Sequence, residues 1–108
     1  MADVPEITAD ELASALVGGA VLVDVRQPDE YVEGHVADAR LIPLGDLSVR
    51  ARELPKAEPV YLICRSGVRS HRAAEFLQLS GVQAVNVAGG MLAWADGGHP
   101  VVTGPSPS

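Results

Sequence analysis

The chain alternates short apolar, β-branched runs with segments whose apolar residues recur at helical spacing, and this alternation is what most restricts its fold. Strand-like runs are expected at Ile7 and over residues 20–25, 41–42, 60–63 and 84–87. A strand, a helix and another strand in succession favour parallel pairing. The helix carries the chain back to the end of the sheet where the first strand began, so that both strands run in the same direction. We therefore expect an α/β fold with a mostly parallel five-stranded sheet and helices on both faces.

The segments between these runs carry signals for the starts and ends of helices. Thr8 and Glu11 fit a capping box, and Gly18 and Gly19 end the helix that follows. Further helices are expected over residues 27–36, 44–54 and 71–79, and after the pair Gly89 and Gly90. Ser70 is the candidate N-cap for the helix over residues 71–79. These signals divide the chain into the alternating elements that a parallel sheet requires.

Length and composition indicate a single domain. The chain has 108 residues, which is enough for one hydrophobic core but not for two. We expect one domain over residues 1–108 with its core at about residues 6–100. The last residues are rich in Pro, Ser and Gly, so residues 101–108 are expected to form a flexible tail.

The charge of the chain restricts its partners. The formal net charge is -6 at pH 7 and the pI is about 4.8, whereas nucleic acids and anionic membranes attract basic surfaces. We expect neither as a partner. The sequence shows no basic leader and no long apolar run, so a cytoplasmic location is expected. The only cysteine, Cys64, cannot form a disulfide within the chain or build a cysteine-based metal site, and neither a metal nor a cofactor is expected.

Cys64 lies where a strand turns into a helix. The run over residues 60–63 reads as a buried strand, and helical spacing begins seven residues after Cys64. In open parallel sheets, ligands bind beyond the carboxyl ends of the strands, which is where this loop is placed. Unpaired amides and the positive end of a helix dipole favour an anion there, and a thiolate is such an anion. Function is therefore expected at this loop.

The charges around Cys64 also favour a thiolate. Arg65, Arg69 and Arg72 follow it, and no acidic residue occurs between Glu58 and Glu75. A locally positive field lowers the pKa of a thiol and makes the sulfur nucleophilic at neutral pH. The glycine in this loop allows a positive φ, so that successive amides can turn toward an anion. Cys64 is therefore the expected nucleophile.

Four stretches in register resemble the rhodanese (thiosulfate sulfurtransferase) family. They are Cys64-Arg65-Ser66-Gly67-Val68-Arg69, Asp24-Val25-Arg26, Gly34-His35-Val36 and Gly89-Gly90-Met91-Leu92-Ala93-Trp94. Together they cover the chain from about Glu6 to about Trp94, in the order and spacing of one rhodanese domain. The resemblance implies a rhodanese-like three-layer fold and a catalytic cysteine at Cys64. It places the substrate in the loop formed by Arg65, Ser66, Gly67, Val68 and Arg69.

Other residues are expected to support this loop. They are Asp24, Arg26, His35 and Ser70. Asp24 and Arg26 are interpreted as a structural ion pair or hydrogen-bonding unit, with Glu30 a candidate partner for Arg26. The family pattern favours a structural turn at His35 over a general base, but whether His35 or Arg72 takes part in catalysis stays open at this stage.

The expected activity is transfer of a sulfane sulfur through a Cys64 persulfide. A small donor such as thiosulfate loads the cysteine, and cyanide or a thiol removes the sulfur. Thioredoxin-like or sulfur-carrier proteins are open as partners, and so is the physiological donor.

Two alternatives from other classes remain. A sulfur-carrier or docking domain would also keep the reactive cysteine. A phosphatase or arsenate reductase would use a similar loop, but the phosphatase signature has five residues between cysteine and arginine, whereas four separate Cys64 from Arg69. A loop shorter by one residue loses about 3.5 Å of contour. The shorter loop suits one sulfur atom better than a tetrahedral phosphate.

Overall fold

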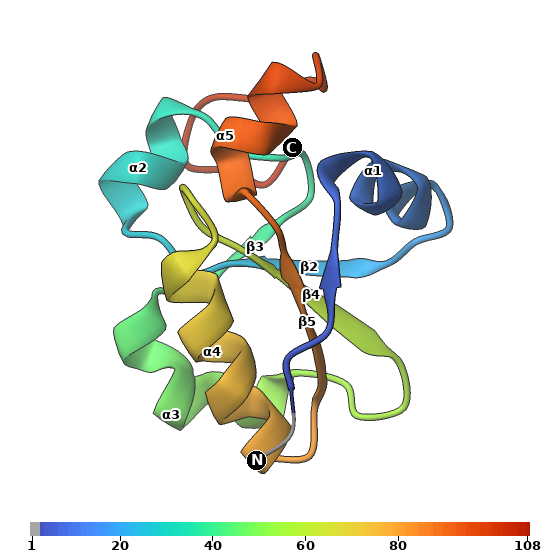
Figure 1. Ribbon diagram of the computed structural model, residues 1–108. Coiled ribbons are helices and arrows are strands. Elements are labelled where there is room, and N and C mark those ends of the chain that lie inside the picture. Colours follow the sequence, from blue (N-terminus) through green and yellow to red (C-terminus); the bar gives the residue numbers. More distant parts are fainter. Residues whose placement is uncertain (1–2) are drawn as a thin grey trace.

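The computed structural model of the protein, which describes residues 3–108, is built on a five-stranded sheet (Figure 1). The strands are β1 (Glu6–Ile7), β2 (Val21–Asp24), β3 (Arg40–Leu41), β4 (Pro59–Ile63) and β5 (Gln83–Val87). Their order across the sheet is β1-β5-β4-β2-β3, and every neighbouring pair is parallel. The predicted α/β fold with a parallel sheet is confirmed.

Helices connect the strands as the alternation predicted. Within residues 3–108 they are α1 (Ala9–Val17), α2 (Pro28–Glu33), α3 (Leu47–Arg50), α4 (Val68–Leu79) and α5 (Gly90–Asp96). Among these described residues, no helix combines the length and the apolar composition needed to cross a membrane.

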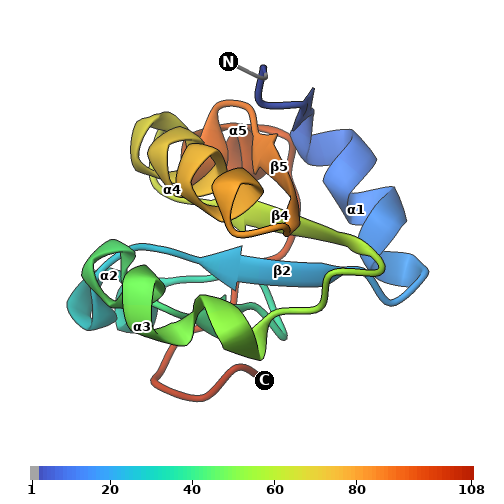
Figure 2. The same cartoon turned by 90° about the horizontal axis from the view of Figure 1, so that it is seen from below.

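The helices cover both faces of the sheet and create two cores. On one face, Val23 and Leu62 pack with Leu77 of α4. On the other face, Leu22 packs with the α1 and α5 side chains Leu12 and Trp94. Neighbouring residues of β2 thus serve opposite cores, because successive side chains of a strand point to opposite faces. Figure 1 shows α3 and α4 at the lower left of the sheet and α1, α2 and α5 above it, and Figure 2 shows β2 and β4 in the centre of the molecule.

Helix starts follow local signals, with one difference that matters for the site. The predicted capping box is present, because the Glu11 amide donates to Thr8 Oγ1 at 3.1 Å and the Thr8 amide donates to Glu11 Oε1 at 2.8 Å. In contrast, α4 begins at Val68 rather than after Ser70. Gly67 precedes it in the left-handed conformation with φ of 100° and turns the chain directly into the helix. Ser70 therefore lies inside the first turn, where its side chain is fully buried.

The two helical segments between β2 and β4 are shorter than predicted. The helix expected over residues 27–36 is limited to α2, which ends at Glu33 and is followed by the C-cap Gly34. The helix expected over residues 44–54 is the single turn of α3, flanked by the 3-10 turns Leu44–Asp46 and Ala51–Glu53. Short helical turns keep the same apolar spacing as a longer helix over a few residues, so the pattern did not distinguish them.

The C-terminal segment, predicted from composition to be a flexible tail, lies along the region that follows α2. Val102 and His35 form an antiparallel bridge, and the Gly104 amide donates to the Val32 carbonyl at 2.9 Å. The Pro107 carbonyl accepts from the Asp38 amide at 2.8 Å. Main-chain hydrogen bonds do not require apolar side chains, so the composition of this segment could not reveal them.

Candidate active site around Cys64

Cys64 directly follows β4, and its sulfur points to the N-terminal turn of α4. The Gly67 amide lies 3.1 Å from Sγ, the Ser70 amide 3.4 Å and the Ser70 hydroxyl oxygen 3.3 Å. The residue is only 1% exposed. Gly67 in its left-handed conformation and the early start of α4 together aim these donors at one atom. The predicted junction of strand, loop and helix thus forms a cradle for a sulfur anion.

These contacts change the acidity of the thiol. Burial raises the pKa of Cys64, but the hydrogen bonds from the Ser70 hydroxyl and from the amides of Ser70, Gly67 and Ser66 outweigh it. The net effect is a pKa below the ordinary value of a thiol, because each donor stabilises the charged form. The lowered pKa agrees with the prediction from the sequence, although hydrogen bonds rather than the arginines account for it.

The turn at Gly89 and Gly90 packs against the cysteine loop. The amides of Met91 and Leu92 donate to the carbonyls of Cys64 and Arg65, at 2.8 and 3.1 Å. A Cβ atom at Gly90 would lie 2.3 Å from the Cys64 carbonyl oxygen, so only glycine permits this approach. The start of α5 therefore holds the backbone of the loop from outside.

Asn86 on β5 is a site residue that the sequence analysis missed. Its side chain is 1% exposed and accepts a hydrogen bond from the Ser70 hydroxyl at 2.6 Å. Its nitrogen donates to the Gly67 carbonyl at 3.1 Å and to Glu6 Oε2 at 2.7 Å. A polar residue inside an otherwise apolar strand was the available signal, because a buried amide needs polar partners.

The arginines of the loop differ in their surroundings. Arg65 and Arg72 are exposed, whereas Arg69 forms two hydrogen bonds to the Glu30 carboxylate, at 2.7 and 2.8 Å. The Arg69 guanidinium lowers the pKa of Glu30 to about 2. The positive charge of Arg69 is therefore partly neutralised by the Glu30 carboxylate. Substrate contact by Arg65 and Arg69 stays a prediction.

Asp24 and Arg26 form the predicted ion pair at the end of β2. Asp24 is fully buried, Arg26 is nearly so, and Arg26 Nη2 lies 2.7 Å from Asp24 Oδ2. Arg26 also donates to the Gly34 carbonyl at 2.7 Å. In contrast to the prediction, Arg26 forms no hydrogen bond to Glu30. Its guanidinium donates to Asp24 and to the Gly34 carbonyl, and the Glu30 carboxylate accepts from Arg69 instead.

His35 lies away from the cysteine loop. Its ring stacks on Tyr31 with centroids 3.6 Å apart, Nδ1 is 2.8 Å from the Tyr31 carbonyl oxygen and Nε2 is 3.3 Å from the Pro107 carbonyl oxygen. These contacts join α2 to the C-terminal segment. None of these side-chain contacts reaches the loop over residues 64–70, in contrast to the predicted role of His35 in supporting that loop.

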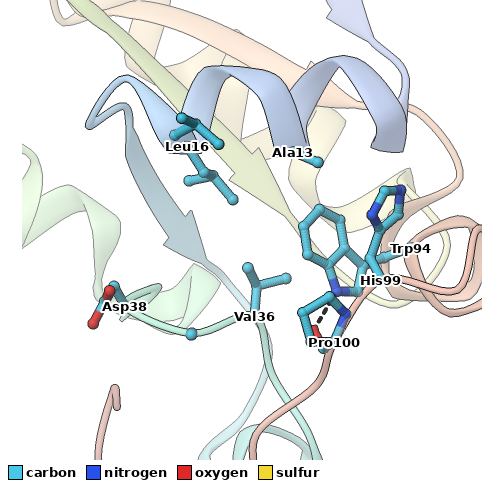
Figure 3. A pocket seen from close by; sticks show the side chains of 9 residues that line it. Ala13, Leu16, Val36, Asp38, Trp94, His99 and Pro100 are labelled. Atoms are coloured by element: carbon cyan, nitrogen blue, oxygen red, sulfur yellow. Dashed lines mark hydrogen bonds between the residues drawn. The ribbon is translucent and has the colours of Figure 1, made fainter.

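A pocket of about 430 Å³ lies beside Arg65 and has both charged and apolar side chains in its lining. It is lined by Arg26, Glu30, Glu33, Gly34, Arg65, Met91, Leu92, Ala95 and Val101. A second pocket, of about 320 Å³, lies between α1 and the segment after α5 (Figure 3). Its Trp94 indole donates to the Pro100 carbonyl at 2.8 Å, and neither Cys64 nor its loop lines it. Of these two pockets, only the one beside Arg65 is lined by a residue of the cysteine loop, and the Cys64 side chain lines neither.

The chain resembles proteins of one family over most of its length. The family model described as "Rhodanese-like domain" matches residues 8–96. A "Sulfurtransferase" from Allochromatium vinosum is 37% identical over 102 residues, which cover 92% of this chain and 95% of that protein. A crystal structure of a rhodanese-related protein from Thermoplasma volcanium aligns with a TM-score of 0.85 and 34% identity, and the alignment covers 91% of this chain and 97% of that one.

A further relative is named for a role in sulfur transport. YrkF of Bacillus subtilis, named as a candidate sulfur carrier protein, is 36% identical over 94 residues, covering 84% of this chain and 51% of that protein. The names of these relatives support sulfur transfer as the general activity. With the parallel sheet, the cysteine cradle and the family match over residues 8–96 together, the chain belongs to the rhodanese-like domain family.

Proposed function

We propose that this protein is a sulfurtransferase of the thiosulfate type, which passes a sulfane sulfur to cyanide or a thiol through a persulfide on Cys64. The observation that carries the proposal is the position of Sγ, which receives hydrogen bonds from two amides and one hydroxyl at the head of α4. Such donors stabilise a thiolate before the reaction. In the persulfide, the proposed role of the loop amides is to stabilise the charge on the sulfur bonded to Sγ.

The first half of the reaction loads the cysteine. The Cys64 thiolate attacks the outer sulfur of thiosulfate, a sulfur–sulfur bond forms, and the bond to the inner sulfur breaks. Sulfite leaves with the electron pair, and the terminal sulfur of the persulfide carries one negative charge. The proposed role of the amides over residues 65–70 is to surround that terminal sulfur. Arg65 is exposed and lines the pocket beside the loop, and its proposed role is to attract the incoming dianion.

The second half empties the cysteine. Cyanide or the thiolate of an acceptor attacks the terminal sulfur, and the bond to Sγ breaks. The Cys64 thiolate is released with the electron pair, so that the charge and the sulfur balance over the cycle. Because Cys64 is the only cysteine of the chain, no second thiol of this chain can resolve the persulfide. The acceptor must come from outside.

Mass spectrometry tests the loading step directly. After treatment with thiosulfate, the native protein is expected to gain the mass of one sulfur atom, which a reducing thiol removes. Cys64→Ser keeps the shape of the site and is expected to gain nothing. Equal addition of sulfur to Cys64→Ser, or no addition to the native protein with thiosulfate or an alkyl persulfide, would refute the proposal.

A sulfur-carrier role is the second candidate, because one relative is named for that function. A carrier would hold the persulfide until a partner protein removes it, whereas an enzyme turns over rapidly with small acceptors. Persulfide lifetime with cyanide, with a small thiol and with thioredoxin discriminates the two. Rapid discharge by cyanide supports the enzyme, and discharge only by a protein thiol supports the carrier.

We also propose thioredoxin-like or sulfur-carrier proteins as partners and the cytoplasm as the compartment. A nucleophilic thiol must stay reduced, which suits a reducing compartment. The acidic chain makes nucleic acid an unsuitable partner.

A further inference from the structure

The reaction described above makes no use of Asn86, although its buried side chain is linked to Cys64 Sγ by two hydrogen bonds through Ser70. The Ser70 hydroxyl stands between the two residues, 3.3 Å from Sγ and 2.6 Å from Asn86 Oδ1. On its far side, the Asn86 nitrogen contacts Glu6 of β1. A connected row of polar groups thus leads from the reactive sulfur into β5 and β1.

The orientation of the Asn86 amide follows from its neighbours. The Gly67 carbonyl and the Glu6 carboxylate face one end of the side chain, at 3.1 and 2.7 Å, and both can only accept from the amide. The nitrogen must point to them, since the opposite orientation would bring three oxygen atoms together. The carbonyl oxygen of Asn86 then faces Ser70, and toward Ser70 it can only accept.

This orientation creates a competition for a single proton. The Ser70 hydroxyl has one hydrogen and two acceptors beside it, the Asn86 oxygen and the Cys64 sulfur. When Cys64 is a neutral thiol, the hydroxyl can donate to Asn86 and accept from the thiol. When Cys64 is a thiolate, the sulfur demands the hydrogen, and the Asn86 and Ser70 oxygens then face each other with no hydrogen between them.

Loading with sulfur removes the competition. In the persulfide, Sγ is bonded to the transferred sulfur and the negative charge lies mainly on that terminal atom. The hydroxyl is then free to donate to Asn86 again. We infer that Asn86 is a positioning residue that directs the Ser70 hydroxyl away from Sγ and so favours the thiol and the sulfur-loaded form of Cys64 over the empty thiolate. The inference rests on the proposed function, because it assigns Asn86 a part in the same persulfide cycle.

The amides keep the sulfur acidic in spite of this competition. The Gly67 and Ser70 amides donate to Sγ and have no rival acceptor comparable to Asn86. The carboxylate, guanidinium and imidazole side chains on the elements around Cys64 belong to β1 (Glu6), the end of β2 (Asp24 and, after it, Arg26), α2 (Asp29, Glu30, Glu33), the loop (Arg65), α4 (Arg69, His71, Arg72, Glu75) and α5 (Asp96). Replacing Asn86 by a neutral residue alters none of these charges.

The variant Asn86→Leu tests the inference, because leucine is similar in size and cannot accept a hydrogen bond. The rate of Cys64 alkylation is measured against pH, which reports the midpoint of thiol ionisation. With its rival acceptor removed, the Ser70 hydroxyl donates to sulfur alone, and the midpoint is expected to fall by about half a pH unit or more. If Asn86 merely braced the loop, the amides would loosen and the midpoint would rise, and a rise or no change overturns the inference.

Two further variants isolate the hydroxyl. Ser70→Ala is expected to raise the midpoint more in the Asn86→Leu background than in the native protein, because the hydroxyl serves the sulfur fully only in the former. Equal rises in the two backgrounds overturn the inference. Glu6→Gln keeps an oxygen that accepts from the Asn86 amide, and it is expected to leave the midpoint close to native. A fall as large as that of Asn86→Leu would assign the effect to the Glu6 charge instead.

A measurement on the native protein covers the case in which Asn86→Leu does not fold. The side-chain amide resonances of Asn86 are followed by NMR through the ionisation of Cys64 and after loading with thiosulfate or an alkyl persulfide. They are expected to change with the midpoint found by alkylation and to return toward the thiol-form positions on loading. Asn86 chemical shifts that stay constant through the ionisation of Cys64 overturn the inference. If mass spectrometry shows no loading at all, the proposed function fails. The titration of the unloaded protein still tests whether Asn86 competes with Cys64 for the Ser70 hydroxyl.

Discussion

Glu30 and Arg69 lie 39 residues apart in sequence, yet their side chains meet in a two-point ion pair between α2 and the first turn of α4. Both nitrogens of the guanidinium fork face carboxylate oxygens, at 2.7 and 2.8 Å. The pair brings a negative charge to Arg69, in a stretch that the sequence alone shows as uniformly basic. In the proposed reaction, a dianionic donor would therefore meet less positive charge than the three arginines suggest.

Removing the Glu30 charge is expected to improve the use of thiosulfate. Glu30→Gln frees the Arg69 charge for the donor, and kcat/KM for thiosulfate in the cyanide assay is expected to rise several-fold, with a stronger dependence on salt. Glu33→Gln is the matched control, because Glu33 lines the same pocket and carries the same charge. A fall in kcat/KM would instead show that the pair is needed to hold the loop in place.

The same ion pair is expected to make stability depend on pH. The pKa of Glu30 is lowered from 4.5 to about 2 in the folded state, so its ionised form stabilises the fold above pH 4.5, and this contribution is lost as the pH falls toward 2. The Glu30 side chain is 27% exposed and that of Arg69 is 35% exposed, so screening by solvent limits the contribution to about 1 kcal/mol. Urea unfolding of the native protein and Glu30→Gln should differ by this amount at pH 7 and converge near pH 2. A difference that persists at pH 2 would contradict the assignment.

Loss of the Ser70 hydroxyl is expected to slow the reaction of Cys64 at neutral pH. The hydroxyl lowers the pKa of the thiol, so Ser70→Ala raises that pKa and reduces the thiolate fraction. Alkylation at pH 7 is expected to slow by about 3-fold or more, with the maximal rate at high pH little changed. Ser66→Ala serves as the control, because Ser66 contributes its backbone amide rather than its side chain. Equal slowing in both variants would exclude the hydroxyl as the cause.

A methyl group at Gly90 is expected to displace the cysteine loop. In Gly90→Ala, the new Cβ would lie 2.3 Å from the Cys64 carbonyl oxygen and 2.7 Å from that of Arg65. We expect a loss of about 2 kcal/mol or more in the free energy of unfolding, together with loss of sulfur transfer. Gly98→Ala is the control, since Gly98 also has a positive φ, of 75°, but its Cβ would have no neighbour within 4 Å. Similar losses in both variants would mean that backbone conformation, and not contact with the loop, is responsible.

Much of the fold was predictable because its signals are local. Apolar runs of strand length alternate with helical spacing, and such an alternation leaves few arrangements other than a parallel sheet. The capping box at Thr8 and the junction at Cys64 were also readable, since each depends on residues close together in sequence. The start of α4 was misplaced, because Ser70 resembles an N-cap while Gly67 performs the turn.

The sequence by itself determined that a lone cysteine follows a buried strand and precedes a glycine and a helix. That order is enough to predict an anion-stabilising loop at the carboxyl end of this strand. Only the tertiary structure decided which side chains surround that loop. Glu30 reaches Arg69 and Asn86 reaches Ser70 from other elements of the fold. Hydrogen bonds and ion pairs act over a few ångströms, so partners 16 or 39 residues apart meet only after the sheet has brought their elements together.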